Sequence, residues 1–576
     1  MTQDIQLFVV DEAHSISDWG HDFRPDYQRI IKLLHHFPST IAILGTTATA
    51  NNRVIADVKE QLGLDLEIVR GDLIRDNLAI QINPKQSKEE RLAWLVEKLT
   101  FDERIKNGQG IIYCLTKRDC EVVSDFLKKY HLSVEAYYSD DKKNMVERLE
   151  KFHKGEVRVL VSTIKLGMGY DKSDIRFIIH YQIPQNLISY YQQIGRAGRD
   201  GTIAYTVVQR GYEDEEILKF FIDSAQVSPT LLKEIVELST HGISVQTLLS
   251  NLNVSFSTLR SGLRKLEIGN FIYLDKKSIV NSTMVRRNIQ NMFDVNEEKK
   301  RQNELNQIRY KEFENLNTYL STSNCYMKFI ANELDAPDIK DRCGICVNCL
   351  NQLIFAFDVN QGNLSLAAEF LRKNHGTIEP RKRWATMDRL PLRWIALTLK
   401  GEMNKNLSIH KDLIHEEGWT LSGEYYSQVG QNVKNGKYVD KFFSEELVQL
   451  SVNFLKEQLI DIKIDLVTFV PSLRRPQLVA NFTKSITDEL QLNFVDAIEK
   501  ISEGKEQKTL QNSQGQQQNV YSTVRLKNVD VVGKNILLVD DMVDSKWSFT
   551  VISALLLDAG ANAVYPYALV KTGSGD

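Results

Sequence analysis

Short apolar runs alternate with amphipathic stretches along roughly the first 215 residues of the chain. Each run is long enough for one buried strand, and the stretches 88–99 and 117–130 repeat their apolar positions at helical spacing. A chain in which strands and helices alternate in this way builds a parallel, doubly wound α/β sheet. The predicted strands are 5–10, 41–47, 110–115, 157–163, 175–181 and 203–209.

The pattern changes between residues 225 and 285, where three short helices and one strand of a hairpin are predicted. A long charged stretch, 297–320, carries a single apolar stripe and is expected to form one solvated helix. Residues 351–375 show only weak periodicity, so we interpret them as a connector.

A second α/β pattern begins near residue 376, and its clearest predicted strands are 465–472 and 535–541. Between these strands, residues 504–519 are polar and rich in Gln, a composition typical of a mobile loop.

The length and the charge limit the classes of protein that fit this pattern. The chain has 576 residues, which suggests about three to five domains. A net charge of -3, from 72 Lys and Arg against 75 Asp and Glu, excludes a uniformly basic nucleic-acid binder but permits a locally basic face. No stretch approaches the roughly 18 apolar residues of a membrane span, and the first residues do not form a secretory signal. We therefore expect a cytoplasmic protein without a membrane partner.

Two adjacent carboxylates, Asp11 and Glu12, follow the first predicted strand and begin the sequence DEAH. Carboxylates at the carboxyl end of a buried parallel strand can hold Mg²⁺ and orient water against a nucleotide phosphate. Many strands end in acidic residues, so the pair alone leaves open whether it is a site or a solvated strand end.

Two later segments supply partners that such a site needs. Arg196 and Arg199 lie in the sequence GRAGRD, where a turn flanked by Gly can present a guanidinium to a transferring phosphate. The segment TIKLGMGYDK, residues 163–172, contains glycines that let the backbone approach a ligand closely. In this order the three segments resemble the motifs of superfamily 2 helicases.

The sequence SISDWGHDFRPDY, residues 15–27, resembles the aromatic-rich loop of RecQ-family DNA helicases. LGTTATA, GIIYCLTKRDCE and IRFIIH resemble further motifs of that family. The loop couples DNA contact to ATP hydrolysis in the family, which implies that its side chains contact single-stranded DNA. The alternative is a surface loop with a packed Trp. The implied DNA-contacting residues are Trp19, His21, Phe23 and Arg24.

The resemblance also implies the residues of an ATP site. Asp11 and Glu12 would bind Mg²⁺ and activate water, and His14 would link the nucleotide to the DNA-contacting elements. Arg199 would be the arginine finger, with Arg196 as its companion. The further nucleotide-binding residues implied are Gly167, Gly169, Asp171 and Gln192.

The chain departs from the family pattern in two places. Gln193 stands where the family usually has Glu, a change expected to alter one hydrogen bond. The sequence also contains no phosphate-cradling G-x-x-x-x-G-K-[ST] segment. We therefore expect the first motor domain to lack its nucleotide-binding half, through either a partial chain or a genuine truncation. Alone, the polypeptide is expected neither to bind ATP tightly nor to unwind DNA.

Four of the six Cys, those at 325, 343, 346 and 349, gather near the middle of the chain. Their two C-x2-C spacings can present four thiolates to a tetrahedral ion, and clustered Cys in a cytosolic protein favour a metal over disulfides. The sequence CGICVNCL closely resembles the RecQ zinc module. We predict a structural Zn²⁺ held by Cys325, Cys343, Cys346 and Cys349, with no position left open for catalysis.

The segment 225–285 is compatible with a winged helix. Its predicted second helix would carry Arg260, Arg264 and Lys265 toward DNA, and Lys276 and Lys277 would lie on the wing. The alternative is a three-helix spacer with a solvated basic face. In the better-known RecQ order the winged helix follows the zinc module, whereas this candidate precedes it.

The strand NILLVDD and the helix after it resemble the phosphoribosyl-diphosphate motif of type I phosphoribosyltransferases. Carboxylates at such a strand end can accept ribose hydroxyls, and the loop and helix N-terminus can hold a phosphate. The loop VPSLRRP resembles the diphosphate-contacting loop of the same family, and the family's usual Thr-Thr-Gly is replaced here by Asp-Ser-Lys. The alternative is a strand–acid–helix unit without a ligand. The implied phosphoribosyl-binding residues are Asp540, Asp541, Ser545, Ser472 and Arg474.

Together these features predict most of a RecQ-type, ATP-dependent 3′–5′ DNA helicase of DNA repair or recombination, fused to a phosphoribosyltransferase-like domain as in some bacterial RecQ proteins. Its expected partners are single-stranded DNA and duplex junctions, ATP with Mg²⁺, and phosphoribosyl diphosphate, and its expected location is the bacterial cytoplasm, at the nucleoid. A non-motor DNA-binding protein with a C-terminal phosphoribosyl-diphosphate site, and a nucleotide-salvage transferase carrying a degenerate helicase, are the alternatives.

The fold class expected is α/β, with domain boundaries that follow the changes in pattern. The predicted domains are the C-terminal part of a first RecA-like domain (1–76), a second RecA-like domain (77–222), a winged helix-like domain (223–290), a helical hairpin with the four-cysteine zinc module (291–352), a linker (353–375) and the phosphoribosyltransferase-like domain (376–576).

Overall fold

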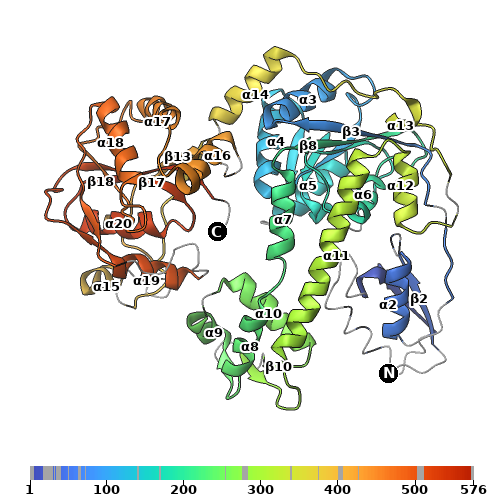
Figure 1. Cartoon of the computed structure of the whole chain (residues 1–576), viewed down its shortest axis with the longest axis horizontal. Coiled ribbons are helices and arrows are strands. Elements are labelled where there is room, and N and C mark those ends of the chain that lie inside the picture. The colour runs from blue at the N-terminus through green and yellow to red at the C-terminus, as the bar shows by residue number, and fades with distance from the viewer. Residues whose placement is uncertain are drawn as a thin grey trace. The chain divides into compact units, whose positions relative to one another are not determined.

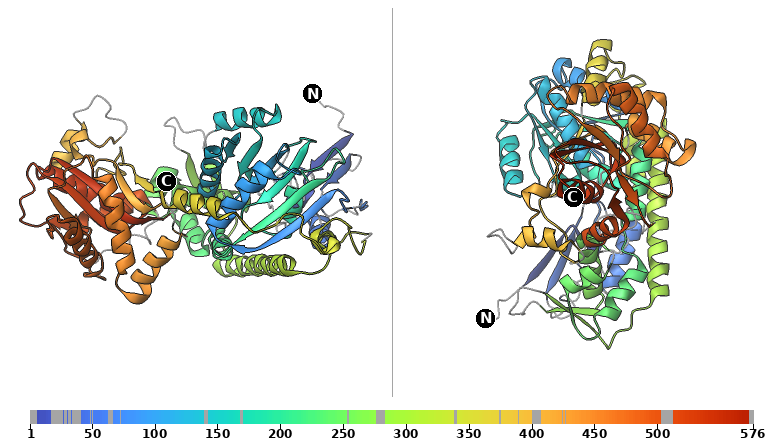
Figure 2. Two further views of the ribbon diagram at one scale, coloured as in Figure 1. Left: turned by 90° about the horizontal axis from the view of Figure 1, so that it is seen from above. Right: turned by 90° about the vertical axis from the view of Figure 1, so that its left-hand side faces the viewer.

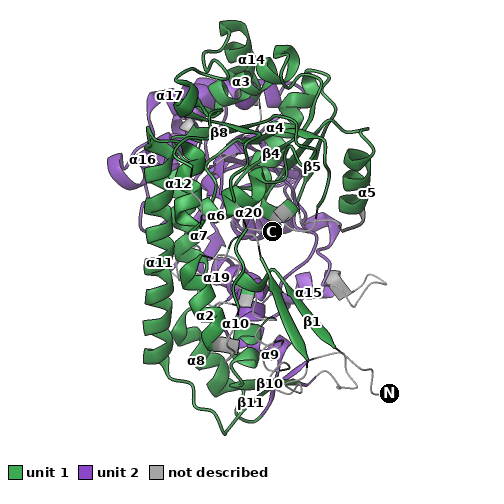
Figure 3. Ribbon diagram, turned by 90° about the vertical axis from the view of Figure 1, so that its right-hand side faces the viewer, with its two compact units in different colours: residues 1–241, 262–274, 286–370 green, residues 242–261, 275–285, 371–576 purple. Residues whose placement is uncertain are grey.

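A computed structural model of the chain describes most of its residues. The described residues are 6–16, 27, 30, 33, 41–47, 49, 51–62, 67–71, 73–138, 142–167, 170–252, 254–275, 283–337, 340–373, 375–388, 390–399, 407–423, 425, 427–502 and 512–572. They fall into two compact units (Figure 3). Unit 1 comprises residues 1–241, 262–274 and 286–370, and unit 2 comprises residues 242–261, 275–285 and 371–576.

Unit 1 begins with two parallel strands, β1 (Leu7–Asp11) and β2 (Ala42–Thr46), both predicted from their apolar runs. Their register places Asp11 opposite Thr46, at the carboxyl ends of both strands. The 3-10 helix η1 (Ala13–Ile16) follows β1 directly, and helix α2 (Asn52–Leu62) follows β2. The first acidic pair therefore lies at the strand ends, as the sequence predicts.

The larger sheet of unit 1 has six parallel strands in the order β3-β8-β7-β4-β6-β5. Strands buried on both faces read as nearly continuous apolar runs, and four of the six were predicted on that basis. The sequence pattern missed β3 and β5. The strands are β3 (Leu78–Gln86), β4 (Gln109–Tyr113), β5 (Val134–Tyr137), β6 (Val159–Ser162), β7 (Ile175–His180) and β8 (Ala204–Gly211).

Helices connect these strands, and the predictions for 88–99 and 117–130 are confirmed. Helix α3 begins with a capping box in which the Ser87 hydroxyl accepts the backbone N–H of Glu90 and the Glu90 carboxylate accepts that of Ser87. The helices of this part are α3 (Lys88–Phe101), α4 (Lys117–Lys129), α5 (Lys142–His153) and α6 (Leu187–Ile194).

The three short helices and the long helix predicted next are also confirmed. Helix α11 (Val295–Ser321) packs along α6 and along α7 and α8, as Figure 1 shows. The elements from α7 to α11 are α7 (Asp214–Ser224), α8 (Pro229–Leu238), β9 (Ile243–Ser244), α9 (Val245–Asn251), α10 (Phe256–Ile268), β10 (Ile272–Asp275), β11 (Met284–Arg287) and α11.

Helix α14 (Gln361–Lys373) forms part of the connector predicted at 351–375. The ring of Phe370 in α14 lies 5.0 Å from that of Phe126 in α4, centroid to centroid. The Lys129 ammonium also lies 4.5 Å from the centre of the Phe370 ring. These tertiary contacts stabilise a helix that a weak sequence pattern did not indicate.

Unit 2 is built around a five-stranded sheet in the order β12-β13-β18-β17-β14, parallel except for β12. The long strands β17 and β18 lie side by side, and both views in Figure 2 show them in red. The strands are β12 (Gly376–Ile378), β13 (Gly418–Ser422), β14 (Leu466–Phe469), β17 (Asn535–Val543) and β18 (Ala563–Lys571).

Helices cover both faces of this sheet (Figure 1). Alternate residues of β17 enter two separate cores, because successive side chains of a strand point to opposite faces. Leu537 packs in the core with α17 (Glu445–Gln458) and α18 (Leu478–Leu490), and Leu538 in the core with α20 (Trp547–Asp558).

The Gln-rich segment was predicted to be a loop, and that prediction is wrong for its second part. Helix α19 (Ser513–Thr523) begins within it, and residues 503–511 lie outside the described residues. Gln517 of α19 is buried, and its side-chain oxygen accepts the backbone N–H of Ala385 over 2.7 Å.

Within the part of the chain that the structure describes, no helix combines the length and the apolar character that crossing a bilayer requires.

Candidate functional site

The carboxylate of Asp11 is held at the end of β1 by two hydrogen-bond donors. The hydroxyl of Thr46 donates to Oδ1 over 2.7 Å, and the backbone N–H of Glu12 donates to the same atom over 2.9 Å. These hydrogen bonds, that of Thr46 first, hold the pKa of Asp11 below its usual value. An ionised carboxylate at this place fits the oxygen ligands that Mg²⁺ prefers.

A path of polar contacts leads from Glu12 away from the strand, and it is hydrogen-bonded from His14 onward. The buried ring of His14 places Nδ1 3.2 Å from Oε2 of Glu12 and 2.9 Å from the hydroxyl of Thr47. The Thr47 hydroxyl accepts the backbone N–H of Thr49 over 3.2 Å. The side-chain amide of Gln192, in α6, then donates to the hydroxyl of Thr49 over 3.1 Å. The path joins three predicted residues through two threonines of LGTTATA.

The turn that carries the two predicted arginines depends on a glycine in the left-handed region. Gly198 has φ +62, and a Cβ on it would lie 2.6 Å from the side-chain amide nitrogen of Asn77 and 2.8 Å from the carbonyl of Thr202. The guanidinium of Arg75 donates to the carbonyls of Ala197 and Gly198 over 3.1 and 3.2 Å. Arg75 and Asn77 therefore support this turn, and sequence analysis did not identify either of them.

The structure brings together Arg199 and Asp171, two of the predicted residues. Nη1 of Arg199 lies 2.5 Å from Oδ1 of Asp171, and the arginine side chain is 39% exposed. Arg196 is buried instead, and its Nη1 donates to the carbonyl of Tyr170 over 2.9 Å. Of the two guanidinium groups, that of Arg199 is the one that solvent and a ligand can reach.

Gln193 makes a buried contact next to the same turn. Its Oε1 lies 2.6 Å from Nε2 of His180, which stacks on Tyr113 with 5.3 Å between ring centroids. Burial lowers the pKa of His180 to about 4, and the hydrogen bond that Oε1 of Gln193 accepts from its ring offsets only part of this effect. Gln193 therefore faces a neutral ring.

Several of the other predicted residues lie outside the described part of the chain. Gly167 ends the 3-10 helix η2 (Ile164–Gly167). The roles predicted for the residues outside the described part stay predictions. These residues are Trp19, His21, Phe23, Arg24, Gly169, Lys276 and Lys277.

The basic residues predicted on the recognition helix differ in their surroundings. Arg260 and Arg264 are exposed on α10. Lys265 forms an ion pair with Glu298 of α11, so its charge is matched by that carboxylate.

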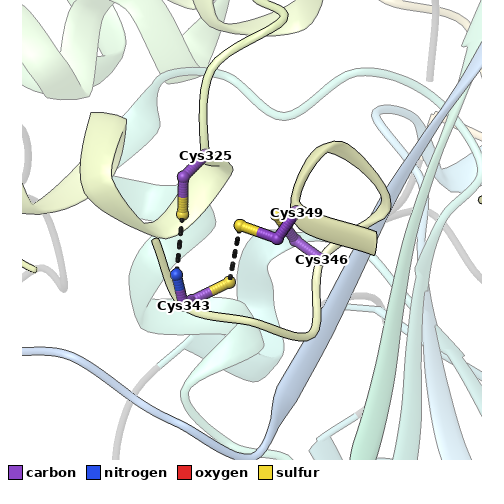
Figure 4. A group of neighbouring side chains, drawn as sticks. All are labelled: Cys325, Cys343, Cys346 and Cys349. Atoms are coloured by element: carbon purple, nitrogen blue, oxygen red, sulfur yellow. Dashed lines mark hydrogen bonds between the residues drawn. The ribbon is translucent and has the colours of Figure 1, made fainter. Parts of the chain in front are cut away.

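The four clustered cysteines form a candidate metal centre (Figure 4). Their sulfur atoms all lie within 4.8 Å of one another. Tetrahedral zinc with bonds of about 2.3 Å requires sulfur atoms roughly 3.8 Å apart, so the donor set fits Zn²⁺. Cys346 caps the short helix α13 (Val347–Leu350), and the guanidinium of Arg342 donates to the carbonyl of Cys349 over 2.9 Å. The turn that carries these cysteines is thus held by backbone contacts as well as by its thiols.

In unit 2, one pocket of about 460 Å³ lies where β14 and β17 end. The loop after β14 and the loop between β17 and α20 both line it. All of the residues predicted to bind a phosphoribosyl group line this pocket: Asp540, Asp541, Ser545, Ser472 and Arg474.

Two lysines of the pocket were not predicted from the sequence. Lys437 comes from the π-helix η4 (Gly436–Asp440), and its Nζ lies 2.9 and 2.8 Å from the two carboxylate oxygens of Asp541. Lys500 comes from β15 (Ile498–Lys500), and burial lowers its pKa. Burial and the neighbouring Asp541 raise the pKa of Asp540 well above its usual range.

A stack of tryptophans supports the loop between β17 and α20. Nε of Arg381 donates to the carbonyl of Ser545 over 2.8 Å, and its guanidinium carbon lies 4.5 Å from the centre of the Trp547 ring. Trp384 stacks on Trp547 and on Trp394, with ring centroids 6.5 and 5.4 Å apart. The loop is therefore anchored to the core of unit 2 at the point where the pocket begins.

Comparison with known proteins supports the helicase motifs. Residues 1–58 match the DEAD/DEAH box helicase family, and residues 90–201 match the helicase conserved C-terminal domain. The chain is 35% identical over 224 residues to the RecQ-like DNA helicase blm-1 of Caenorhabditis elegans, a match that covers 38% of this chain and 22% of that protein. It is also 35% identical over 230 residues to the ATP-dependent DNA helicase RecQ of Bacillus subtilis (strain 168), covering 39% of this chain and 37% of that protein.

A solved structure of Dbp5 from S. cerevisiae bound to RNA and ADP BeF3 overlaps 39% of this chain and 58% of that chain, with 19% identity and a TM-score of 0.32. The matched part spans less than two fifths of the length of either helicase relative. The similarity to RecQ-family helicases of superfamily 2 that the motifs predict is confirmed for this part of the chain.

Proposed function

We propose that this chain provides the carboxylate and arginine side of the ATP site of a RecQ-type DNA helicase, which moves 3′–5′ along single-stranded DNA in repair or recombination. The path of polar contacts from Glu12 through His14 and the two threonines to Gln192, hydrogen-bonded from His14 onward, is the observation that carries the proposal. Such a path can transmit a change at the carboxylates to the helix that leads into the arginine turn.

Each residue has a defined task in this proposal. Asp11, kept ionised, would hold Mg²⁺, which would supply the positive charge that neutralises the phosphates. Glu12 accepts the proton of the attacking water, and His14 fixes the orientation of its carboxylate. Arg199 exchanges Asp171 for the transferring phosphate, where its guanidinium stabilises the developing charge.

The experiment is DNA-stimulated ATP hydrolysis and strand separation by the intact protein. Glu12→Gln should abolish hydrolysis, because it removes the carboxylate that accepts the proton of the attacking water. Arg199→Ala should also abolish hydrolysis, because an arginine finger alone contributes about 10³- to 10⁵-fold in rate. Arg118→Ala is the matched control, since this side chain is 41% exposed and pairs with Glu121 on the surface of α4. Hydrolysis that survives Glu12→Gln would contradict the proposal.

The proposed ATP site also requires a phosphate-binding loop. The sequence contains no G-x-x-x-x-G-K-[ST] segment that could form one. We therefore expect the 576-residue polypeptide alone to show no DNA-stimulated ATP turnover. Turnover by this polypeptide that is lost on Glu12→Gln would refute this part of the proposal.

We further propose a second function, the binding of phosphoribosyl diphosphate by unit 2. The observation in its favour is the convergence of two strand-end loops, with carboxylates and cationic side chains, on one pocket. Isothermal titration with millimolar phosphoribosyl diphosphate should give saturable heat that Asp541→Asn reduces. The absence of heat at this concentration would remove the ligand site.

A further inference from the structure

The acidic end of the pocket in unit 2 contains a lysine in direct contact with a carboxylate. Lys437 lies within 2.9 Å of both oxygens of Asp541, and the two side chains are 20% and 9% exposed. The contact joins residues far apart in sequence, one in η4 and the other at the end of β17. An ion pair this sheltered from solvent is screened much less than a surface pair.

The pocket as a whole has more cationic than acidic side chains. Five cationic and three carboxylic side chains line it, which leaves an excess of positive charge before any ligand binds. The cationic residues are Lys437, Arg474, Arg475, Lys500 and Lys546, and the acidic residues are Asp540, Asp541 and Asp544.

The protonation states of Asp540 and Lys437 strengthen this excess. Burial and the adjacent Asp541 raise the pKa of Asp540, which favours its neutral form. Burial alone would lower the pKa of Lys437, but its contacts with Asp541 outweigh that effect, and the pKa is raised. Lys437 therefore remains an ammonium group, and the acidic end has little net negative charge to attract a divalent cation.

We propose that this pocket binds its sugar-phosphate ligand directly, without a divalent metal ion, because the Lys437 ammonium occupies the cation position beside Asp541. This inference rests on the phosphoribosyl-diphosphate binding proposed above. Mg²⁺ in other phosphate sites bridges one or two carboxylates and the phosphates of the ligand. Here Lys437 neutralises the carboxylate, the remaining lone pairs of Asp541 accept ribose hydroxyls, and the arginines and lysines contact the phosphates.

The test is isothermal titration of the full chain with phosphoribosyl diphosphate, once with excess EDTA and once with millimolar Mg²⁺. Wild-type protein should bind with affinities in the two buffers that agree within about threefold. Lys437→Met leaves an unpaired carboxylate facing an anion, so affinity in EDTA should fall by at least about tenfold. Mg²⁺ should restore part of that loss, since it can now bind Asp541.

Two controls separate this effect from a general loss of charge or of folding. Lys456→Met removes an exposed lysine of α17 and should leave both affinities unchanged. Lys437→Arg keeps the positive charge and should keep binding in EDTA. Circular dichroism establishes that each variant is folded. The comparison of the wild-type affinities in EDTA and in Mg²⁺ tests the inference without any variant.

The possible failures are distinguishable. Wild-type binding that requires Mg²⁺ would overturn metal-independent binding and leave the proposed ligand intact. Lys437→Met that binds like wild type in EDTA would also overturn the role of Lys437. No binding in either buffer would refute the proposed ligand itself, and the inference with it.

Discussion

Gln192 and Thr49 join two segments of unit 1 that are far apart in sequence, through a hydrogen bond of 3.1 Å from the glutamine amide to the threonine hydroxyl. Thr49 is buried and follows the strand beside the carboxylates, and Gln192 lies in α6, one turn before the arginine turn. In the function proposed above, this pair is the point at which a change at one motif would reach the other.

Removing the hydroxyl of Thr49 should weaken this coupling without disturbing the fold. A hydrogen bond of this kind contributes about 1 kcal/mol net, so we expect Thr49→Val to reduce DNA-stimulated ATP hydrolysis by the intact protein by about fivefold. Thr49→Ser keeps a hydroxyl and should retain most of the activity. Equal rates for the Val and Ser variants would show that the contact does not couple the motifs.

The arginine turn should not tolerate a side chain at Gly198. Ala there would have both an unfavourable φ of +62 and a Cβ contact of 2.6 Å with Asn77. Gly201 is the matched control, because its φ is +83 and a Cβ on it meets nothing within 4 Å. Gly201→Ala should cost about 1–2 kcal/mol in unfolding free energy. Gly198→Ala should cost more and should also reduce ATP hydrolysis, and equal effects of the two substitutions in unfolding assays would contradict this account of the turn.

Acid should destabilise unit 1 through His180. Its pKa is lowered to about 4 by burial, against about 6.5 in an unfolded chain. The unfolded chain therefore binds a proton that the folded unit does not, so stability present above pH of about 6.5 decreases as the pH falls. Below pH of about 4, the total decrease in the unfolding free energy is about 3 kcal/mol.

Gln193→Glu tests this assignment, because a carboxylate beside His180 would raise the pKa of the ring. We expect the difference between the thermal midpoints at pH 8 and pH 5 to become smaller in this variant. Gln449→Glu adds the same charge at an exposed position of α17 and serves as the control. The same pH dependence in all three proteins would exclude His180 as the source.

The four-cysteine site should hold one zinc per chain. Cys349→Ser should lose the metal and lower the unfolding free energy by several kcal/mol, since binding of a structural zinc contributes to folding. Cys120→Ser, at a buried thiol in α4 outside the cluster, should keep it. Metal analysis by mass spectrometry checks both expectations, and a metal-free wild-type protein that melts at the same temperature would refute the structural role.

Local sequence signals predicted the elements that depend on local patterns. The strands β1 and β4 follow from their apolar runs, and helix α3 follows from the helical spacing of its apolar positions. Strand β3 was missed because Gln81 interrupts its apolar run. Gln81 is buried, and its side-chain oxygen accepts the backbone N–H of Ile354 over 2.9 Å, a contact across more than 270 residues that no local pattern reveals.

The same limit applies to the sites. Asp540 and Asp541 could be predicted because a strand that ends in acids is a local signal. Lys437 could not, because it reaches Asp541 from a single π-helical turn 104 residues earlier in the chain. Arg75 likewise supports Gly198 from a position 123 residues away. Contacts of this kind depend on the tertiary fold.

The aromatic stack beneath the pocket has a practical consequence. Trp547 directly follows the pocket loop and lies against Trp384 and Arg381, so a ligand that shifts Ser545 also changes the surroundings of an indole. Indole emission depends strongly on its immediate environment. For the ligand binding proposed above, the fluorescence of Trp547 would therefore report occupancy of the pocket in the unlabelled protein.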